Sequence, residues 1–464
     1  MKKIRHIEAM VFTACFCICM GCASGDVQDL SADTGEIAVD SQMSISDVQT
    51  VESNKNEDAE SNVSLETSEE TTPEKIDVLS NYQKYDRTYS ADTFTVRELD
   101  SLKGREDDFV MGADISLYST ILEAGGKYLN AEGEEESICK ILADSGVNTV
   151  RIRLFNDYSS PYGTACGRLT EDRVIGMIKE AKQYDLKVIL DLHYSDTWAD
   201  PSNQKIPYAW KDMSYSETLN AFYDYTKGVL TDIKNENLSI DYIQIGNEID
   251  YGIIKPQGDI DWNNQSESFD RLAEILSQGS KATREVFPDC KIIINTANGL
   301  YRWTYEDTWG SAELFYYQEL VKRNLDFDIV GSSFYTMVDP TPISVISDII
   351  DIYKKEINKP VMIVETSYAY TYEWNDYTAN TFYTQDELSE YPVSFQGQTN
   401  FLLDIIDEVA SAKSNNGLGV CYWGAEFIPN TDPDMKTSWA NQALFTYEGV
   451  ASPTLRVFSE CFPQ

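Results

Sequence analysis

The sequence predicts a (β/α)8 TIM barrel over residues 105–464. From Phe109 onward, short apolar runs alternate with amphipathic helical stretches, a pattern typical of parallel α/β structure. The apolar runs number eight, which is the number of strands that closes such a barrel. A doubly wound open sheet is the main alternative, but no glycine-rich phosphate loop follows the first run.

Each predicted strand is an apolar run that is too short for a helix and ends in polar residues. In chain order the predicted strands are Phe109–Ile115, Asn148–Phe155, Lys187–Tyr194, Tyr242–Glu248, Lys291–Ala297, Phe327–Tyr335, Pro360–Tyr368 and Gly419–Glu426.

The helices between these strands are predicted from apolar residues at helical spacing, and often from a capping residue such as Thr170. In chain order they are Glu135–Ser145, Glu171–Tyr184, Ser216–Asn235, Asp270–Phe287, Ser311–Arg323, Pro342–Ile357 and Thr399–Lys413, with a final helix near Ser452–Glu460.

Residues 1–22 have the pattern of a bacterial export signal. A positively charged start precedes an apolar run from about Met10 to Met20, which is too short for a comfortable membrane span. The run ends in Gly21-Cys22-Ala23-Ser24, which resembles a lipoprotein cleavage site and makes Cys22 the candidate for lipidation. An ordinary cleaved signal and an uncleaved anchor are the alternatives. A lipoprotein signal and an ordinary cleaved signal both predict an exported protein, at the cell surface or secreted.

Residues 23–85 are predicted to be a disordered acidic linker that is rich in Ser and Thr. Between Ser24 and Ser80 the only cations are Lys55 and Lys75, and no residue is aromatic. Such a segment cannot bury enough apolar surface to fold alone. We therefore expect a tether that holds the catalytic domain away from the membrane.

The composition narrows the class of partner. A formal net charge of −40 argues against nucleic acid or anionic lipid and suits a neutral substrate. The 29 tyrosines suit a sugar-binding cleft. Four of the nine cysteines lie in residues 1–22, and the remaining five show neither metal-site spacing nor a disulfide framework. We expect a monomer whose only membrane contact is a lipid anchor.

Two predicted strands end in glutamate, Glu248 on the fourth and Glu365 on the seventh. The active site of a TIM barrel lies at these strand ends, and strands four and seven lie on opposing sides of the ring. Hydrolysis of a glycosidic bond needs one protonated and one ionised carboxyl group beside the scissile bond. A lone Glu at a strand end is usually a salt-bridge partner, so the prediction of a catalytic pair depends on both and on their neighbours.

Neighbouring strands supply groups that suit such a pair. Arg151 and Arg153 share parity on the second strand, so both can point inward, where a cation would keep Glu365 ionised. Tyr335 could donate a hydrogen bond to the same carboxylate. Asn247 could hold a sugar 2-hydroxyl, a contact that strengthens in the transition state.

Trp423 offers an apolar face for the sugar ring at the cleavage point. The chain has only two histidines, which argues against a His-based triad or a zinc centre.

Several motifs, in order along the chain, carry a family resemblance. They are Gly112–Ser116, Gly146–Arg153, Asp191–Pro201, Gln244–Glu248 and Val364–Tyr368. With these motifs the chain resembles family 53 of the glycoside hydrolases, the endo-β-1,4-galactanases that cut galactan side chains of pectin. The resemblance covers essentially the whole barrel. It implies endo-acting hydrolysis with retention of anomeric configuration and no cofactor for the chemistry.

The resemblance also implies roles for single residues. Glu248 matches the acid/base and Glu365 the nucleophile, and a retaining pair is roughly 5–5.5 Å apart. The residues implied to line the substrate cleft are Asn247, Arg153, His193, Tyr335, Trp423, Asp114, Asp196 and Trp198.

The chain departs from the family's pattern in two stretches. After Trp423 the family usually has Glu-Pro-Ala-Trp, where this chain has Gly424-Ala-Glu426-Phe427, so the outer sugar subsites differ. Bacterial members often hold calcium in the loop after the seventh strand. Asp376 and Asn380 match ligand positions there, and their oxygens suit Ca²⁺, although other positions carry Trp and Thr. A structural calcium ion is therefore an expectation of the resemblance.

Two other functions remain as alternatives. The altered stretch after Trp423 leaves open an endo-glycanase of the same clan that acts on a glucan or mannan. A lipid-anchored, non-catalytic glycan-binding protein is the second alternative, although it has no need for both Glu248 and Glu365.

Overall fold

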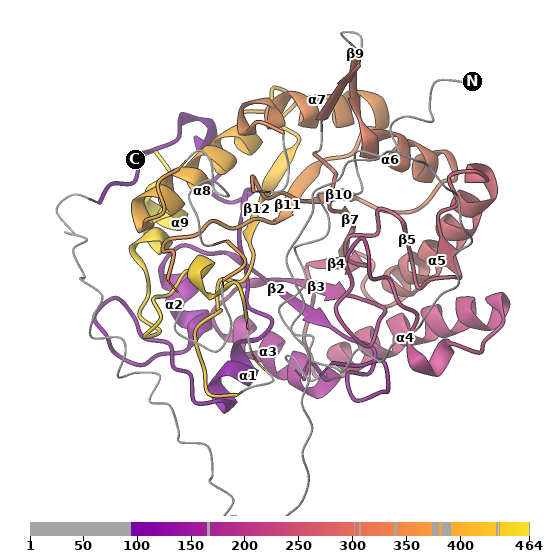
Figure 1. Cartoon of the computed structure of the whole chain (residues 1–464), viewed down its shortest axis with the longest axis horizontal. Coiled ribbons are helices and arrows are strands. Elements are labelled where there is room, and N and C mark those ends of the chain that lie inside the picture. The colour runs from indigo at the N-terminus through magenta and orange to yellow at the C-terminus, as the bar shows by residue number, and fades with distance from the viewer. Residues whose placement is uncertain are drawn as a thin grey trace, which may run out of the picture. The chain divides into compact units, whose positions relative to one another are not determined.

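The computed structural model describes residues 94–164, 168–300, 302–305, 308–337, 341–373, 380–382, 391–432, 435 and 437–463. Within them, eight parallel strands close into a barrel in the order β1-β12-β11-β10-β7-β4-β3-β2. Each barrel strand therefore pairs with the next barrel strand along the chain, and the predicted (β/α)8 fold is confirmed. Figure 1 shows the helices placed around the outside of this ring.

The eight barrel strands correspond one to one with the predicted runs. Their bounds are β1 Val110–Asp114, β2 Thr149–Leu154, β3 Lys187–Leu192, β4 Tyr242–Ile245, β7 Lys291–Thr296, β10 Ile329–Ser333, β11 Val361–Glu365 and β12 Gly417–Tyr422. The last strand ends at Tyr422, not at Glu426, because residues 423–426 form a turn.

The predicted helices occur in the predicted order, and one further short helix, Tyr118–Glu123, was not predicted. Their bounds are α1 Tyr118–Glu123, α2 Ile138–Asp144, α3 Glu171–Gln183, α4 Tyr215–Asn235, α5 Gln265–Val286, α6 Ala312–Lys322, α7 Ile346–Ile357, α8 Phe395–Ala410 and α9 Val457–Glu460. Helix α8 begins four residues before its predicted start, because the Ser394 side chain caps the helix by accepting from the N–H of Gly397.

Apolar side chains fill the interior of the barrel. A separate buried cluster contains Val110, Ile189, Ile293, Ile329, Met362 and Val364, contributed by five different barrel strands. Such layers make a TIM barrel a packed core and not a pore.

Two short hairpins extend the loops at the carboxyl ends of strands, and neither is predicted from the sequence. Strands β5 Gly252–Ile253 and β6 Gly258–Asp259 pair in the loop after β4. Strands β8 Arg302–Tyr305 and β9 Thr308–Ser311 pair in the loop after β7, and Figure 1 shows β9 near α6 and α7.

The segment 94–104, which precedes the predicted start of the barrel domain, packs against the barrel. Leu99 and Leu102 are buried, and the N–H of Leu99 donates to the carbonyl of Cys461 (2.8 Å). Arg97 pairs with Asp404 of α8 (2.6 Å). The predicted signal, the linker, Cys22 and Asp376 lie outside the described residues. No helix of the described chain is long and apolar enough to cross a membrane.

Candidate active site

Arg151 of β2 lies at the centre of the polar side chains at the strand ends. Its Nη1 is 2.8 Å from both Asp114 Oδ2 and Glu365 Oε1. Its Nη2 is 2.8 Å from Asp191 Oδ2 and 2.8 Å from Asn247 Oδ1. The guanidinium is fully buried, and its Nε also donates to Gln244 Oε1 (3.3 Å), so protein groups satisfy its charge. One cation thus connects β1, β3, β11 and the end of β4.

Glu365 is held by two donors from different strands. Arg151 binds Oε1, and the hydroxyl of Tyr335 donates to Oε2 at 3.0 Å. The β10–β11 register shifts between Ser332 and Ser333, which places Ser333 opposite Glu365. Burial raises the pKa of Glu365, and the charges of Arg151 and Arg153 oppose this rise. These donors favour the ionised carboxylate.

Glu248 has an unusual backbone conformation. It follows Gly246 (φ 82°) and itself has φ 49°, a region that non-glycine residues seldom adopt. The Oδ1 atom of Asn295 accepts a 2.7 Å hydrogen bond from its backbone N–H. A Cβ on Gly246 would approach Ile249 to 2.7 Å, so the turn needs glycine.

The side chain of Glu248 favours the protonated form. Burial, then the charge of Glu365, then that of Asp250 raise its pKa well above the usual value, against an opposing hydrogen bond from Ser333. The two carboxyl groups interact, so they titrate as a pair. Of the two, only Glu365 directly contacts a cation among the described residues, so these surroundings favour the proton on Glu248.

Arg153 supports the site from the same face of β2. Its Nη2 is 3.0 Å from Asp114 Oδ1, and its guanidinium lies 4.2 Å from the ring centroid of Trp198 and 5.5 Å from that of Trp423. The N–H and hydroxyl of Ser116 both donate to Asp114 Oδ1.

Aromatic rings line the site beside the carboxyl pair. The Trp423 ring packs edge-on against Trp198 (6.4 Å), Tyr335 (6.5 Å), Phe427 (5.1 Å) and Trp439 (5.0 Å between centroids). Trp198 and Trp423 are only partly buried, so they keep apolar surface accessible. These packed rings bring together three residues that were predicted to line the cleft, Trp198, Tyr335 and Trp423.

His193 is fixed by hydrogen bonds on both ring nitrogens. Its Nδ1 accepts from the N–H of Ala199 (3.0 Å), which leaves Nε2–H to donate to Asp191 Oδ2 (3.0 Å). Its ring packs against Phe155 and Trp198. The described contacts make His193 a support for Asp191, which itself binds Arg151.

Asp196 connects two loops and is buried. It accepts hydrogen bonds from the N–H of Asp157, the hydroxyl of Ser160 and the N–H of Tyr208. Its carboxylate thereby joins the loop after β2 to the loop after β3. It shapes the rim of the site through the chain's own backbone.

Three further residues belong to this network and were not predicted from the sequence. Gln244 donates to Asp191 (2.9 Å) and Asn247 (3.0 Å), and its place in the fourth-strand motif was a usable signal. Gln204 donates to the carbonyls of Asn247 (2.7 Å) and Glu248 (3.2 Å) from a long loop. Neither Gln204 nor Trp439 has a periodic pattern around it that marks it in the sequence.

Asn380, a predicted calcium ligand, is buried. Its Nδ2 donates to the carbonyl of Glu373 (2.6 Å), while its Oδ1 has no hydrogen-bond partner among the described residues. Among the described residues, no group of three or more His, Cys, Asp or Glu side chains is arranged to hold a metal ion.

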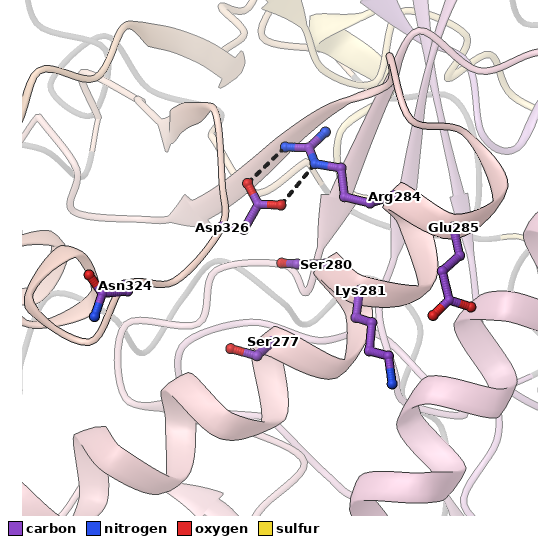
Figure 2. A pocket seen from close by; sticks show the side chains of 7 residues that line it. All are labelled: Ser277, Ser280, Lys281, Arg284, Glu285, Asn324 and Asp326. Carbon is purple, nitrogen blue, oxygen red and sulfur yellow. Dashed lines mark hydrogen bonds and ion pairs between the residues drawn. The ribbon is translucent and has the colours of Figure 1, made fainter.

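A separate surface pocket of about 400 Å³ lies away from this site. It is lined from the carboxyl-terminal half of α5 and from the segment before β10, at the amino end of the barrel strands. Figure 2 shows Arg284 of this pocket paired with Asp326. The buried carboxyl pair and the partly buried tryptophans are at the opposite end of the barrel.

The buried carboxyl groups of Glu248, just after the fourth barrel strand, and Glu365, at the end of the seventh, lie at the end of a TIM barrel that carries the active site in glycoside hydrolases. The comparison with known families agrees. Residues 110–458 match the model of glycosyl hydrolase family 53. The chain belongs to this family and is a glycoside hydrolase.

Relatives and solved structures give the same family. The endo-β-1,4-galactanase of Bacillus subtilis (strain 168) is 30% identical over 77% of this chain and 87% of its own. The arabinogalactan endo-β-1,4-galactanase of Thermothelomyces thermophilus is 31% identical over 75% of this chain and 98% of its own. The solved family 53 catalytic domain of Ignisphaera aggregans has a TM-score of 0.72 at 30% identity, covering 80% of this chain and 100% of that structure.

Proposed function

We propose that this protein is an endo-acting β-1,4-galactanase that cuts the galactan of type I arabinogalactan with retention of configuration. The galactanase relatives support the substrate. The buried carboxyl pair supports the chemistry, with Glu365 bound to Arg151 and Tyr335 and Glu248 in surroundings that favour its proton. Glycoside hydrolases need no cofactor for this reaction.

In the first step Glu248 gives its proton to the glycosidic oxygen as the bond to the anomeric carbon breaks. Glu365 attacks that carbon from the opposite face and forms a covalent galactosyl ester. In the second step the Glu248 carboxylate takes a proton from water, and that water displaces Glu365. Two inversions retain the configuration, and both carboxyl groups return to their starting states.

The surrounding side chains position these two groups. Arg151 and Tyr335 orient Glu365 and stabilise its charge. Asn247 binds Arg151 through its Oδ1, and its Nδ2, which donates to the carbonyl of Ala199, has a second hydrogen for the sugar 2-hydroxyl. Trp423 supplies the face for the ring at the cleavage point. Arg153 and Trp198 support Trp423, and Asp114, His193 and Asp196 act through the side chains they hold.

The test is incubation with linear β-1,4-galactan, followed by analysis of product length and anomeric configuration. We expect short galacto-oligosaccharides that first form as the β-anomer. Glu365→Gln should abolish hydrolysis without changing the melting temperature. The control Glu132→Gln, at an exposed carboxylate, should leave hydrolysis unchanged. Turnover by Glu365→Gln close to that of the unaltered enzyme would refute the assignment.

The same experiment separates the two alternatives. Activity on cellulose or mannan without activity on galactan would indicate an endo-glycanase of other specificity. Retention on immobilised glycan with no release of reducing sugar would indicate a binding protein. The galactanase relatives argue against a different substrate, and the complete carboxyl pair argues against a protein that only binds glycan.

We propose further that the enzyme is exported and anchored by a lipid on Cys22, with residues 23–85 as a tether and the barrel as a monomer. The lipoprotein-like Gly21-Cys22-Ala23-Ser24 sequence supports the anchor. In cells that express the full chain, Cys22→Ser should move galactanase activity out of the membrane fraction. Activity that stays in that fraction unchanged would contradict the lipid anchor.

A structural calcium ion is the last part of the proposal. The buried Oδ1 of Asn380 lacks a hydrogen-bond partner and is an oxygen of the kind that binds Ca²⁺. Asp376 is the proposed second ligand. Treatment with EDTA should lower the melting temperature, added Ca²⁺ should restore it, and Asn380→Ala should remove this response. An equal response in that variant would exclude Asn380 as a ligand.

A further inference from the structure

Two exposed aromatic side chains lie beside one buried ring outside the cleavage site. Trp262 is 44% exposed and Phe315 is 38% exposed, whereas Phe269 between them is fully buried. Both rings pack edge-on against Phe269, with centroids at 6.4 Å for Trp262 and 5.9 Å for Phe315. Grouped large aromatic side chains on a soluble protein mark interaction sites. We call Trp262 and Phe315 the rim aromatics.

The rim aromatics lie at the end of the barrel that carries the carboxyl pair. Trp262 lies just before α5, and Phe315 is the fourth residue of α6. These helices return from the carboxyl ends of β4 and β7, so their amino-terminal turns lie at that end. The segment that leaves Glu248 reaches Trp262 through the β5–β6 hairpin.

The rim aromatics are carried on well-supported backbone. The N–H of Ile260 donates to the carbonyl of Tyr251 (3.1 Å), and Ser268 of α5 bonds to the carbonyl of Asp261 (3.4 Å). Arg323 lies over the Phe269 ring at 5.7 Å and pairs with Asp270 at 2.7 Å. Binding to such a surface needs little ordering of the protein.

The chemistry around the rim aromatics fits a neutral carbohydrate. Exposed Asn263 and Gln265 offer amide groups, and exposed Asp261 and Glu267 offer acceptors. Sugar hydroxyls use both kinds of group, while the C–H face of a pyranose covers an aromatic ring. The acidic neighbours and the net charge of −40 disfavour an anionic partner or a second copy of this chain.

We propose that the rim aromatics form a second binding site for the neutral polysaccharide that the enzyme cleaves. This inference rests on the proposed function. A long chain that occupies both sites is held close to the carboxyl pair by effective concentration, whereas a short oligosaccharide reaches only one site. The rim aromatics therefore affect polymer binding and leave the bond-breaking step unchanged.

The test uses the full-length chain with Glu365→Gln to prevent hydrolysis, and affinity electrophoresis in long linear β-1,4-galactan. Adding Trp262→Ala and Phe315→Ala should weaken binding about tenfold, equivalent to 1.4 kcal/mol. Leu122→Ala is the matched control, because Leu122 is 43% exposed on α1. Trp262→Phe with Phe315→Tyr should restore most of the affinity, because both aromatic faces remain.

A second measurement uses the active enzyme and separates this site from the cleavage site. The Ala variants should raise KM for long galactan and leave kcat/KM for a short galacto-oligosaccharide unchanged. Equal binding by the variants, an equal loss on the short substrate, or a dimer that only the unaltered chain forms would each overturn the proposal. If the unaltered enzyme cleaves another neutral glycan and not galactan, galactan is not its substrate. The same comparison of variants with that other glycan then tests whether the rim aromatics bind polysaccharide.

Discussion

Arg151 sets the charge balance of the candidate active site. It contacts three carboxylates, Asp114, Asp191 and Glu365, in a fully buried position. Burial, then the negative charges of Glu365 and Asp250, raise the pKa of the nearby Glu248 and favour its protonated form, whereas Arg151 directly contacts Glu365. Arg151 therefore gives the two glutamates different electrostatic surroundings.

Replacement of Arg151 by Lys should shift the acidic side of the pH profile. Lysine keeps the charge but loses the planar fork that binds Glu365 and Asn247 together. The pKa of Glu365 then rises, and since Glu365 acts ionised, the acidic limb of kcat/KM moves to higher pH. We expect kcat to fall about a hundredfold through misplacement of the carboxylate.

The control for this prediction is Arg153→Lys. Arg153 pairs with Asp114 and not with Glu365 in the described contacts. The acidic limb of kcat/KM should therefore move less in Arg153→Lys than in Arg151→Lys. An acidic limb that is unchanged in Arg151→Lys would show that Arg151 does not set the protonation of Glu365.

Glu426 predicts a pH dependence of stability. It is fully buried, its Oε1 accepts from the N–H of Leu117 (2.8 Å), and its Oε2 has no hydrogen-bond partner in the part of the chain that the structure describes. Burial and the charge of Asp114 raise its pKa to about 8 against the opposing charge of Arg153. The folded state thus keeps a proton that the unfolded state releases above pH 4.5. The unfolding free energy falls as pH rises through this window, by at most about 1.4 kcal/mol per unit.

Glu426→Gln keeps the shape of the protonated side chain and removes its titration. The melting temperature of the variant relative to the unaltered chain should therefore rise between pH 5 and pH 8 and level off above pH 8. Thermal melts at matched ionic strength measure the difference. Melting curves that stay parallel across this range would rule out a buried, protonated Glu426.

At the scale of elements, the turn after β4 positions Glu248. The positive φ angles of Gly246 and Glu248 turn the chain sharply, and Asn295 of β7 holds the turn through the backbone N–H of Glu248. Backbone strain of this kind persists only where the surroundings enforce it, and it concentrates at functional sites.

Asn295→Ala should therefore reduce catalysis more than substrate binding. The variant leaves a buried N–H unpaired, at a cost of about 1–3 kcal/mol, and frees the Glu248 backbone. We expect kcat on galactan to fall at least about tenfold with little change in KM, because a small displacement of an acid/base group is enough. Steady-state kinetics measures both constants.

Thr296→Val is the matched control on the same strand. Thr296 is buried and bonds to the hydroxyl of Tyr317 (3.1 Å), away from Glu248. The Thr296→Val variant should have a lower free energy of unfolding and an unchanged kcat. Equal losses of kcat in the two variants would assign the effect to general destabilisation of β7.

Sequence patterns predicted the elements well, because eight apolar runs with regular spacing determine which residues become strands. The same patterns placed Glu248 and Glu365 at strand ends. They could not predict the positive φ of Glu248, which depends on Asn295 from another strand. They also missed Trp439, which lies sixteen residues beyond Trp423 and reaches the site only through the path of the loop after β12. Contacts between distant segments leave no local period in the sequence.

At the scale of the whole molecule, the described barrel begins before the first strand. Phe94, Leu99 and Leu102 are buried, and Arg97 and Ser101 bond to Asp404 and Asp407 of α8. The hydrogen bond from Leu99 to Cys461 joins this segment to the last turn of the chain. The segment therefore packs against the outside of the barrel, next to α8 and α9.

Two truncations test where the folded domain begins. A chain that starts at Phe94 keeps every described element, so its melting temperature and its kcat on soluble galactan should equal those of the full chain. A chain that starts at Arg105 loses the burial of Leu99 and Leu102, which contributes roughly 3–6 kcal/mol, and should melt several degrees lower. Because the segment lies far from the carboxyl pair, its kcat below the melting transition should be unchanged. Equal melting temperatures for the two truncated chains would show that residues 94–104 do not contribute to the stability of the barrel.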